Sequence, residues 1–339
     1  MKKVYKGADL FKLLAAIGVI AIHTSLPFFN TLGRLGVPLF AIFTSFFFFK
    51  HFFSLEKKDI STYIRTFEKR IILLFLTWEI FYIPLAVKVF MSLMRKWGGI
   101  DFVNIIKYII CFFLPAIDNA NGINLTYDAN GWDISWYLFA LIVGIPLFLF
   151  LIKVMRHKDM MIGIVCVLLE IYFILANEFN SLSHLAPYAT HTCLRLFIYF
   201  YIGYMFAKYE KNLLKINNKK YIICVLLFLG LFLLENFLIY VINGAVAVEE
   251  IITTAPTSAL IGGFALRYSP SFIHNSRNIR NLSTFLYCSQ KWPLVLVSHF
   301  FNSNAMLFFI LVLGLCLIGY LVYMSIKEKT KWKFWSYMV

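Results

Sequence analysis

Ten apolar stretches, each long enough to cross a lipid bilayer as a helix, dominate this 339-residue chain. Of all residues, 61% are hydrophobic and only 14% are charged, a balance outside the range of soluble proteins. Backbone in lipid must satisfy its own hydrogen bonds, so such stretches form helices. We therefore expect an all-α polytopic membrane protein with a single membrane-embedded domain over residues 1–339. The stretches lie at 10–29, 34–53, 71–94, 134–152, 160–177, 191–207, 221–242, 249–266, 282–300 and 304–326.

The positions of Lys and Arg indicate how the chain crosses the membrane. A shorter apolar run at 102–117 is assigned as an outer interfacial or re-entrant segment, because counting it as a span would invert every later loop. Most of the 32 Lys and Arg then fall in cytoplasmic segments. The prediction is about ten transmembrane helices with both termini cytoplasmic. The net charge of +15 then reflects topology, and no nucleic-acid partner is expected.

Several features are expected to serve structure alone. The first apolar run has no small-residue cleavage site and is predicted to be a permanent span. The loop 54–70 is predicted to be an amphipathic segment at the cytoplasmic surface, and the C-terminal "KEKTKWKFWSY" an interfacial anchor. Neither disulfides nor a metal site is expected, since the cysteines lie inside apolar stretches without paired spacing. They are Cys111, Cys166, Cys193, Cys224, Cys288 and Cys316.

The first apolar run carries a polar stripe. Lys12 and His23 are 11 residues apart, which returns them to within about 20° of one helix face and separates them by about 16 Å along the axis. Asp9 is paired with Lys12 at i, i+3. Ionisable groups at membrane depth face a cavity or a partner, and a neutral imidazole suits a general base. The alternative is that Lys12 is a membrane anchor and His23 only hydrogen-bonds a neighbouring helix.

Five stretches in the same order resemble the acyltransferase-3 family of integral membrane acyltransferases. The opening "DLFKLLAAIGVIAIHT" is similar to the family's first helix, which carries an Arg and, after ten residues, a His. "RLGVPLFAIFTSFFFF" resembles the second helix, and "WDISWYLFAL" the start of a later one. "CLRLFIYFYIGYMFAK" and "LSTFLYCSQ" are similar to two further family helices. Together these matches extend along almost the whole chain.

The resemblance implies transfer of an acyl group, most often acetyl, from cytoplasmic acyl-CoA to a hydroxyl of a cell-surface or lipid-linked glycan. The catalytic residues would be His23, as the base, and Asp9. Acyl-CoA would be a donor substrate with no bound cofactor, and its phosphates would be held by Lys12, Arg65, Lys69 and Arg70. Positive charge that only sets topology is the alternative for the basic loop. The expected location is the plasma (inner) membrane of a bacterium, as a multi-pass protein.

The acceptor is expected at the opposite side of the membrane. Arg34 and Arg195 match family arginines and are predicted to organise that side of the cavity, against Asp118, Asp128, Asp133 or a substrate; structural ion pairing is the alternative. Trp132, Asp133, Trp136 and Tyr137 are candidates for stacking on a sugar ring and accepting its hydroxyls. For any one of these residues, an interfacial aromatic belt is the competing explanation and the one favoured by residue type alone.

Departures from the family pattern open further questions. Lys12 replaces the usual Arg, and Thr44 and Ser45 replace Ser-Gly, which narrows the room for close helix approach. Gln290 stands where a late His is usual, and Lys291 after it is a buried charge that needs a partner. Candidate partners are Glu79, Glu170 and Glu235. A transporter or flippase of glycans or small molecules, with these charges along its path, is the competing function.

Overall fold

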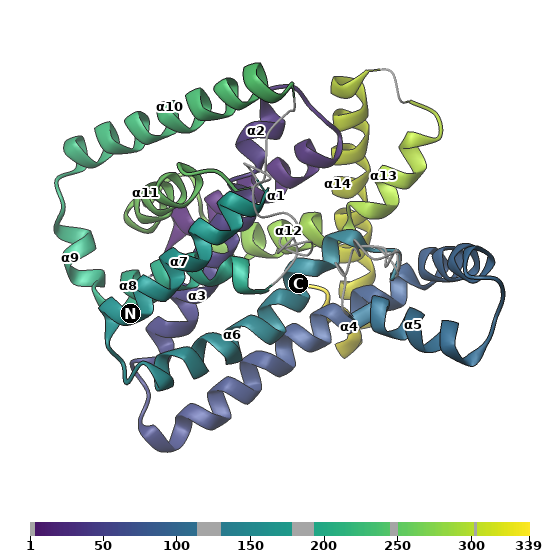
Figure 1. The fold of residues 1–339 in the computed structure, drawn as a ribbon, viewed down its shortest axis with the longest axis horizontal. Coiled ribbons are helices and arrows are strands. Elements are labelled where there is room, and N and C mark those ends of the chain that lie inside the picture. Colours follow the sequence, from purple (N-terminus) through teal and green to yellow (C-terminus); the bar gives the residue numbers. More distant parts are fainter. Residues whose placement is uncertain (1–3, 114–129, 178–192, 245–249, 302–303) are drawn as a thin grey trace.

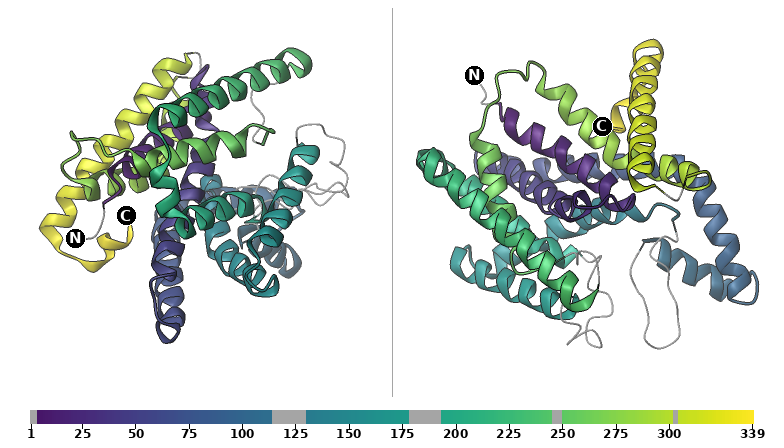
Figure 2. Two further views of the ribbon diagram at one scale, coloured as in Figure 1. Left: turned by 90° about the vertical axis from the view of Figure 1, so that its left-hand side faces the viewer. Right: turned by 90° about the horizontal axis from the view of Figure 1, so that it is seen from above.

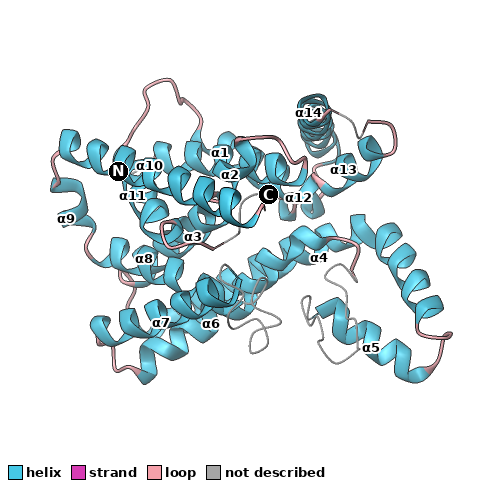
Figure 3. Ribbon diagram, turned by 45° about the horizontal axis from the view of Figure 1, so that its top comes forward, coloured by secondary structure: helices cyan, strands magenta, loops and turns pink. Residues whose placement is uncertain are grey.

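The computed structural model describes residues 4–113, 130–177, 193–244, 250–301 and 304–339, and among these it contains helices and no strands (Figures 1 and 3). The longer helices are α1 (Lys6–His23), α3 (Gly36–Phe52), α4 (Lys57–Lys96), α5 (Phe102–Phe113), α6 (Trp136–Val154), α7 (Asp159–Asn177), α8 (Phe197–Lys208), α10 (Asn218–Asn243), α11 (Thr254–Arg267), α12 (Ser276–Ser289), α13 (Lys291–Ser298) and α14 (Ala305–Thr330). The short elements are α2 (Phe29–Gly33), α9 (Glu210–Lys215), and the 3₁₀ turns η1 (Asp133–Ser135), η3 (Cys193–Leu196) and η4 (Lys333–Tyr337).

Local sequence signals set several helix ends. Asn217 and Asn304 precede α10 and α14, and each side chain accepts hydrogen bonds from backbone N–H groups of the first turn. These bonds satisfy donors that a helix start otherwise leaves without partners. α10 ends at Gly244, which has a left-handed φ of 65° that glycine adopts without a steric penalty.

Within the described part of the chain, five helical segments are long and apolar enough to cross a membrane: Phe29–Phe52, Lys57–Lys96, Asp133–Val154, Asn218–Ile242 and Ala305–Thr330. These confirm a helical membrane protein. α8 and α11 contain 12 and 14 residues, so each rises only about 18–21 Å against a hydrocarbon core of about 30 Å. The ten-span count and the cytoplasmic placement of both termini stay predictions.

Two sequence assignments need correction. Most of the predicted loop 54–70, from Lys57 on, forms one continuous helix of 40 residues, α4, with the predicted span 71–94. The run 282–300 is two helices, α12 and α13, that meet at Gln290. Pro293 explains this break, because its ring lacks an N–H and clashes with the carbonyl four residues earlier, at Ser289.

The segment predicted as interfacial or re-entrant forms α5 over most of its length. α5 packs on the C-terminal part of α4, at one end of the molecule (Figures 1 and 3). Tyr108 supports this contact, since its hydroxyl donates a hydrogen bond to the carbonyl of Ala86 at 3.1 Å. The position of α5 relative to the membrane stays a prediction.

α1 lies at the centre of the helix packing. It contacts α2, α3, α11, α12 and α14, and its most extensive contact is with α12. α3 also packs along α8, and α14 packs against α12 and α13 (Figure 2). Residues from α1, α3, α6, α8 and α12 share one buried core. The helices that carry the predicted site therefore belong to one packed unit.

At the N-terminal end of α1, polar side chains from distant segments meet. Lys50 pairs with Glu210, and the hydroxyl of Tyr5 also donates to the Glu210 carboxylate. Burial, followed by the hydrogen bond to Glu210, raises the pKa of Tyr5. The charge pattern assigns Lys50 and Glu210 to the same side of the membrane, and the structure brings them into contact.

Gly203 allows the close approach of α8 and α3. A Cβ atom at this position would lie 2.5 Å from the carbonyl oxygen of Ile42 and 2.7 Å from the Cβ of Ser45. Ser45 in turn donates a hydrogen bond to the carbonyl of Phe200 at 2.6 Å. The room that Ser45 was expected to remove from the second helix is thus supplied by a glycine on its partner.

Substitution of Gly203 by Ala is expected to destabilise the protein by about 1–3 kcal/mol, because the helix backbones must move apart. Thermal unfolding of the detergent-solubilised protein measures this. Gly230→Ala is the matched control, since its Cβ would meet no atom within 4 Å. That control should unfold at or slightly above the wild-type temperature. Equal unfolding temperatures for the two variants would contradict the packing argument.

Candidate functional site

A large cavity of about 520 Å³ lies between α1, α3, α4, α6 and α12. Its wall includes three cationic side chains: Lys12 on α1, Arg70 on α4 and Arg280 on α12. They are close enough to act electrostatically on one another. No Asp or Glu occurs among the described residues that line it. Three like charges around one cavity favour an anionic ligand that relieves their repulsion.

Hydroxyl groups and aromatic rings complete this wall. The ammonium of Lys12 lies 5.0 Å from the ring centroid of Phe47. Ser283, Thr284 and Tyr287 follow Arg280 at intervals of three, four and seven residues, which places them on the same face of α12. The large cavity thus combines a positive region with hydrogen-bonding and apolar surface.

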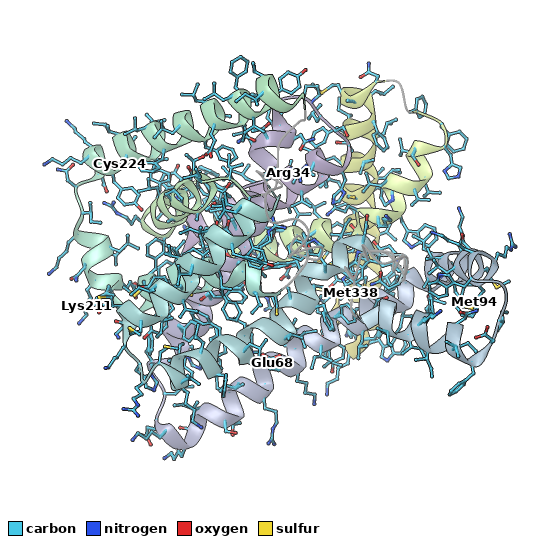
Figure 4. All side chains as sticks on the ribbon, viewed as in Figure 1. Arg34, Glu68, Met94, Lys211, Cys224 and Met338 are labelled. Atoms are coloured by element: carbon cyan, nitrogen blue, oxygen red, sulfur yellow. The ribbon has the colours of Figure 1, made fainter. Side chains whose placement is uncertain are left out.

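A second, small cavity of about 100 Å³ lies at the C-terminal end of α1. Five of the predicted site residues line this cavity: His23, Arg34, Asp133, Trp136 and Arg195. Figure 4 labels Arg34 at the junction of α2 and α3. These side chains come from four separate segments of the chain. The small cavity therefore gathers one imidazole, two guanidinium groups, a carboxylate and an indole.

Tyr287 is the one described residue that lines both cavities. Its hydroxyl donates a hydrogen bond to the carbonyl of Ile134 at 2.7 Å. The Tyr287 ring lies 5.5 Å from that of Phe40 and 5.7 Å from that of Tyr137. The two cavities are thus neighbours on α1, separated by aromatic rings.

The structure does not bring Asp9 to His23. The two residues are 14 positions apart on α1, which separates them by about 21 Å along the axis. Asp9 is buried and accepts a hydrogen bond from the hydroxyl of Ser276 at 2.7 Å. Because the helix is continuous, Asp9 cannot orient the His23 ring by direct contact. Its position suits placement of Lys12 and the start of α12.

Three further predicted residues lie outside both cavities. Arg65 and Lys69 are exposed on α4, and only Arg70 of that basic segment lines the large cavity. Trp132 is fully buried and stacks on the Tyr82 ring with centroids 4.9 Å apart. Trp132 is therefore a core residue. Tyr137 lines the large cavity, not the small one where an acceptor platform was expected.

Arg195 forms an ion pair that sequence reasoning missed. Its guanidinium pairs with the carboxylate of Glu250, and the side chains are only 4% and 1% exposed. The Tyr199 hydroxyl also donates to Glu250, at 2.6 Å. The Arg195 guanidinium also lies 5.5 Å from the Trp136 ring centroid. The suggested partners Asp118 and Asp128 lie outside the described residues, and Asp133 has another partner.

The partner of Asp133 is Lys291, the charged residue that was expected to need a partner inside the membrane. The ammonium of Lys291 lies 2.9 Å from the Asp133 carboxylate. The three glutamates proposed for this role are occupied elsewhere or lie apart: Glu79 accepts from Asn130, and Glu235 accepts from the backbone at the start of α11. Glu170 is buried. Lys291, which follows the helix break at Gln290, thus pairs with a residue that lines the small cavity.

Gln290 itself lines neither cavity. It is fully buried, and its side-chain amide donates to the carbonyl of Tyr287 at 2.9 Å. Gln290 therefore supports the backbone of the residue that separates the cavities.

Two contributions to the large cavity were not predicted. Arg280 was counted only as cytoplasmic charge, although its spacing to Ser283, Thr284 and Tyr287 on one helix face was readable. Val339 lies on the cavity wall, and the carbonyl of Met338 accepts a hydrogen bond from the Trp78 indole at 3.1 Å (Met338 is labelled in Figure 4). The C-terminal segment is thus more than an interfacial anchor.

Comparison with known proteins gives one finding. A family model described as an acyltransferase domain matches residues 5–324, a range that includes every residue lining the small cavity. No curated protein and no solved structure shows significant similarity to the chain.

Proposed function

Because this chain belongs to the acyltransferase-3 family, we propose that it is an integral membrane O-acyltransferase that uses acyl-CoA, first of all acetyl-CoA, as donor. The acceptor is a hydroxyl of a cell-surface or lipid-linked glycan. The observation that supports this proposal is the pair of cavities along α1, one lined by three cations and the other by His23, with Tyr287 on both walls.

The donor occupies the large cavity. Lys12, Arg70 and Arg280 bind the phosphates of CoA, since guanidinium and ammonium groups form charge-assisted hydrogen bonds with phosphate oxygens. The long pantetheine arm extends past the hydroxyl and aromatic side chains toward Tyr287. The thioester then lies next to the small cavity.

The acceptor hydroxyl reaches the small cavity beside His23. A ring nitrogen of His23 accepts the hydroxyl proton while the acceptor oxygen attacks the thioester carbonyl carbon. The new C–O bond forms, the C–S bond breaks, and the CoA thiolate leaves and takes up a proton. Arg34, Asp133 and Trp136 line the same cavity. In this proposal Arg34 stabilises the oxyanion, and Asp133 and Trp136 contact the acceptor.

The two cavities also suit a location in the plasma membrane of a bacterium. The donor is made in the cytosol, and a surface glycan lies on the other side of the bilayer. Lys12 and His23 lie about 16 Å apart along α1, which is about half of a hydrocarbon core of about 30 Å. No feature of the described residues favours the competing transporter function over this one.

The donor half of the proposal is tested at Arg280. We expect Arg280→Ala to weaken binding of acetyl-CoA about 10- to 100-fold, because a charge-assisted hydrogen bond contributes about 1.5–3 kcal/mol. Isothermal titration of the purified protein in lipid nanodiscs measures this. Lys69→Ala is the matched control, since Lys69 is exposed and lies outside both cavities. Absence of acetyl-CoA binding by the wild type would refute acyl transfer from CoA and return attention to transport.

A further inference from the structure

Tyr287 occupies the boundary between the donor and acceptor cavities. It is buried, at 4% exposure, and faces the large cavity on one side and the small cavity on the other. Its hydroxyl is fixed by the 2.7 Å hydrogen bond to the carbonyl of Ile134, which itself lines the small cavity. The backbone of Tyr287 is held as well, by the buried amide of Gln290.

The neighbouring rings restrict the room further. Phe40 and Tyr137 lie 5.5 Å and 5.7 Å from the Tyr287 ring, in edge-to-face arrangement, and 6.0 Å from each other. Tyr137 is also within 3.4 Å of the Thr44 hydroxyl, measured between the two oxygens. These ring contacts and the hydrogen bond to Ile134 hold the Tyr287 ring in place at the edge of the large cavity. An acyl group that leaves the donor must fit at this boundary.

We infer that Tyr287 is the residue that selects the length of the acyl group. This inference rests on the proposed function. The small cavity has a volume of only about 100 Å³, against about 520 Å³ for the large cavity. An acetyl group and a reacting hydroxyl fit such a space, whereas a chain of six carbons requires the room that the Tyr287 ring fills. The ring thus excludes longer acyl groups by steric overlap.

The test uses CoA thioethers, which bind but cannot transfer an acyl group. S-ethyl-CoA and S-hexyl-CoA are titrated into the wild type, Tyr287→Ala and Tyr287→Phe in nanodiscs. We expect the wild type to prefer S-ethyl-CoA by about 10-fold or more, in the range by which pockets discriminate added methylenes. Tyr287→Ala should lose this preference, and Tyr287→Phe should keep most of it because the ring remains.

Tyr63→Ala is the matched control. Tyr63 lines only the large cavity, and its hydroxyl likewise donates to a backbone carbonyl, that of Phe48 at 3.1 Å. The ratio of the two affinities should stay at the wild-type value in this variant. If Tyr287→Ala does not fold, Tyr287→Leu replaces it with a smaller loss of volume.

The outcomes separate the inference from the proposed function. If the wild type binds neither thioether, donor binding by CoA fails and the inference fails with it. If the wild type binds both equally, or if Tyr287→Ala or Tyr287→Leu retains the wild-type preference, only the role of Tyr287 is overturned. Loss of the preference in Tyr63→Ala as well would also overturn it, since the selectivity would then belong to the whole large cavity.

Discussion

Replacement of His23 by Ala is expected to lower acyl transfer by about 10²- to 10⁴-fold, the usual contribution of a positioned general base. His23 ends α1 and lines the small cavity, and it is the one described imidazole there. Without it, the acceptor hydroxyl has no nitrogen base within the cavity to take its proton. Proton NMR of the host's surface polysaccharide measures the outcome, as loss of the O-acetyl signals seen with the intact protein.

The variant protein should still reach the membrane and unfold at the wild-type temperature. His23 is exposed, and substitutions at exposed positions usually change stability by within about 0.5 kcal/mol. His157→Ala is the control, because His157 is exposed and lies outside both cavities. Unchanged acetylation in a stably inserted His23→Ala protein would exclude His23 as the base. Unchanged acetylation after deletion of the whole protein would exclude the glycan acceptor instead.

The sequence predicted where helices form better than where each helix begins, ends or breaks. Each of the ten apolar stretches contains a helix in the structure, because twenty apolar residues in a row have few other stable conformations in lipid. The extension of α4 through a charged segment was not readable from hydropathy, because Lys, Arg and Glu form helices as readily as Leu does and a charged run therefore marks no helix boundary. The break before Pro293 was readable from the proline but was outweighed by the apolar pattern around it.

The site was predictable where residues share one helix. Lys12 and His23 are on α1, so their spacing alone fixed their relation. Partnerships between helices were not predictable, because packing decides which side chains meet. Arg195 and Glu250 are 55 residues apart in sequence, and Glu250 was read only as part of an apolar stretch. Lys291 reaches Asp133 only because the chain turns at Gln290.

The Arg195–Glu250 pair supports a second large effect, on stability. Both side chains are almost completely buried, at 4% and 1% exposure. Removing one partner of such a pair leaves an uncompensated charge in a medium that solvates it poorly, which costs about 3–5 kcal/mol. In Glu250→Ala, the hydroxyl of Tyr199 also loses the oxygen to which it donates at 2.6 Å. We therefore expect Glu250→Ala to lower the unfolding temperature strongly and to reduce the yield of folded protein.

Thermal unfolding in detergent, followed by size-exclusion chromatography, measures this loss. Glu250→Gln should fall between the wild type and Glu250→Ala, because its amide oxygen still accepts hydrogen bonds although the charge is gone. Glu56→Ala is the matched control: it breaks the pair with Lys58, whose side chains are 75% and 74% exposed, and exposed pairs contribute about 0–1 kcal/mol. If Glu250→Ala unfolds at the same temperature as Glu56→Ala, the buried pair does not stabilise the fold. If Glu250→Ala unfolds far lower, the ion pair between Arg195 and Glu250 is a main structural contact of the protein.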